Sequence, residues 1–322
     1  MRHLIRAHIY CAVFLLVAGL FGSDESTGAP EEATAPSPMV AAGQRYVATL
    51  SAAQRRVGVR TFQDAERRRW SFLPGKRPGI TLRSMSAEQR KAAGALVRSG
   101  LSESGYTKLH GIFTLERILR AGVSVSQRRA NPTWRDPLLY TLTLFGAPDM
   151  SGTWGWRLGG HHVSFNFTCH NGVPQAERVF FGASPATVWR GEHAGLTPLG
   201  THETRAFELL QSLRPPQHKV AVEAPRIPGG LLAGPGQDPR RVSPAGLPLS
   251  AMNETQQAAV WHLTNAYLGS LTLRAAERFR RRAQSQGPER VRFVWRGASR
   301  PGSDHYYRIQ GPGFVVEYWK NG

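Results

Sequence analysis

The hydrophobic period changes along this chain, and that change constrains the fold more than any other feature. Apolar side chains recur at helical spacing in the first part of the sequence, over residues 40–56, 86–99 and 102–119. Four later segments alternate as β-strands do, at residues 138–145, 154–158, 161–169 and 178–181. The chain therefore predicts a helix-rich N-terminal half followed by strands.

The remainder of the chain repeats this mixture of helix and strand. A short helix is expected at residues 202–213, a Pro/Gly-rich loop at about 223–252, and a long helix from a cap at Asn253 to about 279. Three final strands are expected at 291–295, 305–310 and 314–319. The residue pattern shows no internal repeat. We expect one α+β domain over residues 40–322, with a helix-rich N-terminal half packed against a largely antiparallel sheet.

The N-terminus has the pattern of an export signal. Arg2 and Arg6 precede an apolar run at residues 9–21, which is too short to span a bilayer. This predicts a signal peptide at 1–28, a flexible tether at 29–39, and a periplasmic or secreted protein. An uncleaved N-terminal anchor is the alternative, and no later segment is long and apolar enough for a transmembrane span.

The positive charge does not favour a nucleic-acid partner. The chain carries 41 Lys and Arg against 22 Asp and Glu, for a formal charge of +19, and 36 of those basic residues are Arg. They are spread over the chain, and their densest region is residues 274–300. No aromatic RNA-binding strand, zinc-finger spacing or helix-turn-helix pattern accompanies them. A solvated helix face explains them better than a polyanion site.

The most informative segment for chemistry is residues 159–168. If it is a strand, His161 shares a face with Val163, whereas His162 shares the other face with Ser164 and Asn166. The two histidines then bind one ion together only if the preceding glycines form a bulge. His161 is read either as a core histidine or as a metal ligand, and His162 as lining a polar pocket.

A second candidate cluster is expected from the C-terminal hairpin, where His305 lies on one strand and Glu317 on the next. We expect His162, His305 and Glu317 to converge and bind a divalent metal ion, or to act as an acid/base pair on an unknown small-molecule substrate. Arg157 or Arg308 is then a clamp for an anionic substrate. The structural alternative is an Arg308–Glu317 ion pair.

Cysteine chemistry is a minor hypothesis. Removal of the predicted leader takes Cys11 with it and leaves Cys169 as a single cysteine. Cys169 precedes His170, so it is either a thiol nucleophile or a core residue at the end of an apolar strand face, and the core reading is favoured.

Several blocks in order along the chain resemble the bacterial and fungal domain-of-unknown-function family numbered 3500. They lie at residues 67–80, 84–90, 99–106, 135–148, 154–168 and 305–318. The resemblance implies one shared fold and no particular reaction. Family members continue past the final Glu-Tyr pair into an Asn- and His-rich stretch, whereas this sequence ends at Trp319-Lys320-Asn321-Gly322. The resemblance thus implies a degenerate or shortened member.

Together these patterns give two functional hypotheses. The first is an exported metal-assisted hydrolase or oxidoreductase with a strand-lined pocket that contains histidine. The second is a non-catalytic, envelope-associated binding or structural protein. The sequence alone does not decide whether the protein is an enzyme.

Overall fold

The computed structural model of the chain describes residues 10–17, 37–130 and 135–322. The described helices are α1 (Pro38–Ala48), α2 (Ala52–Gly58), α3 (Ala87–Gly100), α4 (Glu103–Gly122), α5 (Val125–Ala130), α6 (Gly200–Ser212), α7 (Pro215–Ala221), α8 (Glu254–Leu268) and α9 (Leu273–Gln284). The predicted leader and tether fall almost wholly outside the described residues, apart from 10–17 and 37–39.

The described strands join in one 12-stranded sheet. They are β1 (Tyr10–Val17), β2 (Val59–Arg60), β3 (Ile80–Thr81), β4 (Thr141–Phe145), β5 (Thr153–Gly160), β6 (Val163–His170), β7 (Val173–Ala183), β8 (Val222–Ala224), β9 (Leu247–Pro248), β10 (Arg292–Gly297), β11 (His305–Gly311) and β12 (Phe314–Asn321). The main order is β2-β4-β5-β6-β7-β1-β12-β11-β10-β8, and most neighbours are antiparallel. The predicted α+β class is confirmed.

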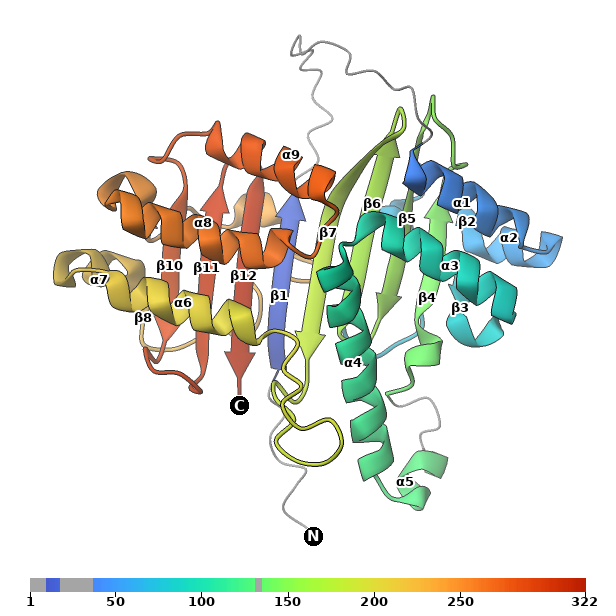
Figure 1. The fold of residues 1–322 in the computed structure, drawn as a ribbon, viewed down its shortest axis with the longest axis horizontal. Helices are drawn as coiled ribbons and strands as arrows, with labels where there is room; N and C mark the ends of the chain where they lie inside the picture. Colours follow the sequence, from blue (N-terminus) through green and yellow to red (C-terminus); the bar gives the residue numbers. More distant parts are fainter. Residues whose placement is uncertain (1–9, 18–36, 131–134) are drawn as a thin grey trace.

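Helices cover one face of the sheet in two groups. Figure 1 shows α1, α3 and α4 over the half that contains β4–β7, and α6, α8 and α9 over the half that contains β10–β12. The core between the layers is rich in aromatic side chains, including Trp154, Trp156 and Trp295. Two long connections, residues 61–79 and 225–246, cover the opposite face. Their backbone groups form hydrogen bonds with side chains of the sheet, either as acceptors or as donors. The sheet is thus buried on both faces.

The order of elements in residues 38–183 recurs in residues 200–321. The first half runs α1, α2, β2, β3, α3, α4 and then β4–β7, and the second runs α6, α7, β8, β9, α8, α9 and then β10–β12. Strand pairing recurs as well: β2 is parallel and β3 antiparallel to β4, just as β8 is parallel and β9 antiparallel to β10. The structure therefore contains an internal repeat that the residue pattern did not indicate.

Matching side-chain contacts support the repeat. In the first half the amide of Gln54 donates to that of Gln89 (Nε2 to Oε1, 3.1 Å), and in the second Gln217 donates to Gln256 (2.9 Å). All four glutamines sit at the third position of a helix that opens with a capping box. The halves meet at an antiparallel bridge between Leu101 and Leu271, which follow equivalent helices. This bridge marks an approximate two-fold relation.

Two predicted helices are each divided in the structure. Ser51 accepts a hydrogen bond from the Gln54 backbone, which starts α2 as a new helix after α1. The expected helix 253–279 breaks between α8 and α9, because Thr272 there donates its backbone N–H to Gly100. Within the described residues no helix is long and apolar enough to cross a membrane.

Candidate metal centre

The two adjacent histidines form the turn between β5 and β6. Gly160 pairs with Val163 in the strand register, so only His161 and His162 remain between them. The expectation that the strand begins at His161 is therefore wrong. His162 has φ of +64°, a left-handed conformation that few residues other than glycine adopt. Its backbone is fixed on both sides, because His162 N–H donates to Phe72 and its carbonyl accepts from Gly182 N–H (2.9 and 2.7 Å).

This turn places both imidazoles on the same side, whereas strand alternation predicted opposite faces. The rings of His161 and His162 are stacked, with centroids 3.7 Å apart. His162 is buried and His161 is partly exposed, with 13% of its side chain accessible. The turn thus brings the two imidazoles together, as a bulge before the strand was expected to do. His161 is the member of the pair that is exposed to solvent.

A buried carboxylate from α4 completes the cluster. Glu116 Oε2 lies 3.0 Å from Nδ1 of His161, and Glu116 Oε1 lies 3.1 Å from Nδ1 of His162. One ligand atom from each residue lies within 4.8 Å of the others, and no other group of three such residues occurs among the described residues. Two imidazoles and one carboxylate are a common donor set for divalent transition metals.

Charges around Glu116 set the protonation of the cluster. Burial opposes ionisation most strongly, but hydrogen bonds from His161 and His162 together outweigh it and lower the pKa of Glu116 from 4.5 to about 2. Burial lowers the pKa of His162 from 6.5 to about 4. The Arg135 guanidinium also donates to Glu116 Oε1 at 2.9 Å. At neutral pH the carboxylate is charged and the His162 imidazole is neutral, which is the state that binds metal.

Neighbouring groups hold the turn in place. The Tyr140 hydroxyl donates to the carbonyl oxygen of His161. This contact depends on Gly160, since a Cβ there would lie 2.4 Å from the Tyr140 ring. The tyrosine therefore fixes the backbone of the turn and does not contact either imidazole through this bond.

The structure does not bring His305 to this cluster. His305 lies on β11, and β12, β1 and β7 separate that strand from β6. Its ring is stacked against Trp295 and Tyr318, and its Nδ1 lies 2.7 Å from the Ser303 carbonyl oxygen. Burial lowers the pKa of His305. The predicted convergence with His162 fails because the two histidines belong to different halves of the sheet.

Glu317 is also elsewhere, on the loop-covered face. Its carboxylate accepts hydrogen bonds from the backbone of Leu232 and Ala233 (2.9 Å each) and from the Tyr306 hydroxyl (2.6 Å). Burial raises the pKa of Glu317. Arg308 is its register partner, and Arg308 Nη1 donates to the same Tyr306 hydroxyl at 3.3 Å. In place of the expected direct ion pair, the tyrosine links the two side chains.

Arg157 and Arg308 occupy equivalent positions in the repeat, and each binds the connection that covers its half of the sheet. Arg157 donates to the backbone and carboxylate oxygens of Glu66, both at 2.8 Å. Arg308 Nη2 donates to the Ser243 carbonyl at 3.0 Å. Both arginines are buried, and neither reaches the histidine turn. They fasten the covering segments to the sheet.

Cys169 lies in the core, as the favoured reading expected. It is fully buried on β6, and burial raises the pKa of its thiol to about 11. A thiol with such a pKa is protonated at neutral pH, so it is a poor nucleophile.

Sequence reasoning missed Glu116 and Arg135. Glu116 had a detectable signal, because it lies four residues after Ile112 on the apolar face of its helix. A carboxylate on such a face has to find a partner when it is buried. Arg135 gave no comparable signal, since it lies in an irregular connection and adopts φ of +50°.

These features define an α+β protein with a duplicated arrangement of elements and a two-histidine, one-carboxylate cluster at one hairpin turn. The chain matches the model of the family described as protein of unknown function, DUF3500, over residues 32–322, and it belongs to that family. The resemblance noted in the sequence is therefore confirmed. Searches of curated proteins and of solved structures found no match.

Proposed function

We propose that Glu116, His161 and His162 hold a divalent transition-metal ion, and that the protein uses this ion on a small-molecule substrate after export from the cytoplasm. The reaction class is metal-assisted hydrolysis or oxidation. The observation that carries the proposal is the meeting of three metal-binding groups at one turn. The export component rests on the N-terminal sequence pattern.

The distances suit a shared ion. Ligand atoms of histidine and carboxylate lie about 2.0–2.2 Å from zinc and similar metals. Two such atoms at right angles around one ion are therefore about 3 Å apart. The Glu116 oxygens already lie 3.0 and 3.1 Å from the two histidine Nδ1 atoms. An ion can enter by replacing these contacts with small side-chain movements.

The internal repeat offers a comparison that supports a functional role for the turn. In the second half the turn between β11 and β12 contains Pro312 and Gly313 where the first half has His161 and His162. Gly313 has φ of +78°, close to that of His162. A glycine adopts this conformation without strain, whereas a histidine costs of order 1 kcal/mol. A purely structural turn does not need two histidines.

Three protein ligands leave coordination positions for water and substrate. A bound zinc ion would activate water for hydrolysis, and a bound iron ion with two histidines and one carboxylate would support oxidation. His161 is the partly exposed member of the cluster, so substrate would approach from its side. Arg135 would fix the orientation of the Glu116 carboxylate.

The Glu116–Arg135 pair favours a second candidate, a non-catalytic role. Arg135 donates to Glu116 at 2.9 Å, and both side chains are buried. The guanidinium already neutralises the carboxylate, so the cluster is also a self-sufficient polar network that locks the turn to α4. This candidate predicts a protein that binds no metal.

Elemental analysis of the full chain, purified without chelator or affinity metal, distinguishes the two. We expect about one equivalent of zinc, iron or manganese, lost in His161→Ala and in His162→Gly. His170→Ala is the matched control, because His170 is exposed at the end of β6 that lies away from the histidine turn. No metal in the wild type after incubation with each of these ions, or equal loss in the control, would refute the metal site.

A further inference from the structure

The second half of the repeat lacks one strand that the first half has, and a segment outside the repeat occupies that position. The first half contributes four long strands, β4–β7, whereas the second contributes three, β10–β12. In the position equivalent to β7 lies β1, from the other end of the chain (Figure 1). β1 is antiparallel to both neighbours: Tyr10–Val17 pair with β12 and residues 11–16 pair with β7.

We propose that the gap between β7 and β12 is an acceptor site for an exchangeable β-strand. Its occupant is an extended apolar segment of about eight residues in the register of β1. Tyr10–Val17, with the sequence YCAVFLLV, is the copy that this chain supplies. The proposal does not depend on the metal centre.

The site requires a strand because it lies in the middle of the sheet. Without an occupant, β7 and β12 would both present unpaired backbone N–H and C=O groups, which is a template for strand addition. Residues on both faces of these strands are buried: Phe181 and Val316 belong to the main core, and Phe180 and Val315 to a second core under the covering connections. An occupant must therefore be apolar on both faces.

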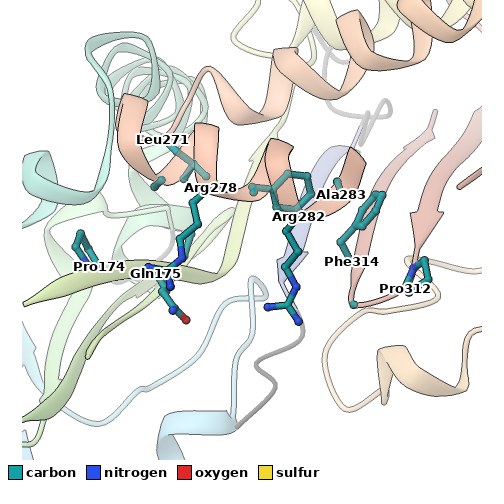
Figure 2. Close-up of a pocket in the computed structure, with 12 residues that line it drawn as sticks. Pro174, Gln175, Leu271, Arg278, Arg282, Ala283, Pro312 and Phe314 are labelled. Carbon is teal, nitrogen blue, oxygen red and sulfur yellow. The ribbon is translucent and has the colours of Figure 1, made fainter. Parts of the chain in front are cut away.

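A cavity extends the site beyond the end of β1. β1 ends at Val17 opposite Phe314, whereas β7 continues for five residues past its last pairing with β1. A cavity of about 80 Å³ lies there, lined by Pro174 and Gln175 of β7, by the Pro312–Phe314 turn and by α9. Figure 2 shows the Arg278 and Arg282 side chains reaching from α9 toward this part of the sheet.

These two arginines favour an acidic residue immediately after the apolar strand. Burial, and then the charges of Arg274, Arg282 and Arg281, lower the pKa of Arg278. A carboxylate at the C-terminal end of the occupant would relieve this repulsion, since the strand runs toward the cavity. The preferred occupant is thus an apolar strand that ends in acidic residues.

Exchange is expected because β1 belongs to the segment that the sequence predicts to be a leader. Processing near residue 28 would remove the covalent link between β1 and the rest of the chain. The acceptor site would then hold its strand only by pairing and packing, as in other cases of strand addition. A free peptide with the sequence of β1 can then compete for the site.

The test uses the full-length protein with a protease cleavage sequence placed at residues 24–28. After folding and cutting, a labelled Tyr10–Val17 peptide with two added C-terminal aspartates is supplied in excess. We expect the label to co-elute with the protein as the original segment is released. A peptide with Phe14→Pro, which lacks a backbone donor, should bind at least tenfold more weakly than one with Phe14→Ala. Two C-terminal lysines in place of the aspartates should also weaken binding.

Three results would overturn the proposal. The cut segment could remain bound without exchange in a large excess of peptide over days. It could instead dissociate while the melting temperature stays unchanged and no peptide binds. Equal binding of the proline and alanine peptides would show that apolar contact, and not strand pairing, holds the segment.

Discussion

His162 combines a strained backbone with a buried side chain, and these two properties are separable by substitution. At φ of +64° both histidine and alanine are strained, whereas glycine is not. We predict that His162→Gly is more stable than His162→Ala by about 1 kcal/mol, because only glycine relieves the strain. Both variants should lose the metal ion. Urea unfolding of the metal-free proteins measures the difference, and an alanine variant as stable as the glycine variant would contradict it.

The lowered pKa of His162 also predicts that the folded protein is less stable at acidic pH. The His162 pKa is lowered from 6.5 in the unfolded chain to about 4 in the folded protein, so between these values the unfolded chain binds more protons. Stability should therefore fall as pH decreases from 6.5 to 4, by up to about 3 kcal/mol from this group. Buried His202 and His305 shift in the same direction. The free energy of unfolding is therefore measured against pH for both wild type and His162→Gly, with chelator present to keep the proteins free of metal. The two curves should diverge between pH 6.5 and 4, and parallel curves would contradict the prediction.

Sequence reasoning located the two histidines but not their arrangement. Alternation along a strand is a safe inference only when the strand boundaries are known, and here a shift of two residues moved both side chains into a turn. The predicted convergence of His305 and Glu317 with His162 was wrong, because it depended on which strands become neighbours, and the sequence pattern does not report that order. Glu116 joins the cluster through the packing of α4 on the sheet, which no local pattern reports.

The helices follow local rules that the sequence does show, and two glycines test how they pack. Gly94 lies within α3, where an added Cβ would be 3.7 Å from the Tyr106 hydroxyl, an ordinary contact. Gly105 lies in the first turn of α4, where a Cβ would be 2.1 Å from the Ser270 carbonyl oxygen. We predict that Gly94→Ala stabilises the protein by about 0.5–1 kcal/mol through helix propensity. Gly105→Ala should cost at least about 2 kcal/mol, because the junction between the halves must move.

Thermal and urea unfolding of the two glycine variants measure this contrast. Each variant is the other's control, since both replace a helical glycine with alanine. Equal effects would mean that the contact at Ser270 yields easily and that the junction is not rigid. The helix cap at Asn253 was visible in the sequence and is confirmed, whereas close backbone contacts such as that of Gly105 require the three-dimensional structure.

The molecule as a whole is two similar halves joined in one sheet, and only one half carries the histidine cluster. The repeat was difficult to detect because residue identities differ, although a methionine before a capping box occurs in both halves, at Met85 and Met252. The halves share the architecture around buried glutamines and the arginines that fasten the covering segments. They differ at the turn, which is His-His in one half and Pro-Gly in the other.

Because the two halves have the same architecture, we predict that substitution of equivalent residues destabilises the protein by similar amounts. Gln89 Nε2 donates to the Thr49 carbonyl at 2.8 Å, and Gln256 Nε2 donates to the Ser212 carbonyl at 2.7 Å. Substitution of either buried glutamine by alanine removes this hydrogen bond together with the amide contact to the other glutamine of its half, which should cost about 2 kcal/mol. The two costs should agree within about 1 kcal/mol and add in the double variant, because the sites are distant. Gln284→Ala, at an exposed position, should change stability by less than about 0.5 kcal/mol. Urea unfolding measures these changes. A large loss of stability from one substitution and none from the other would contradict the prediction.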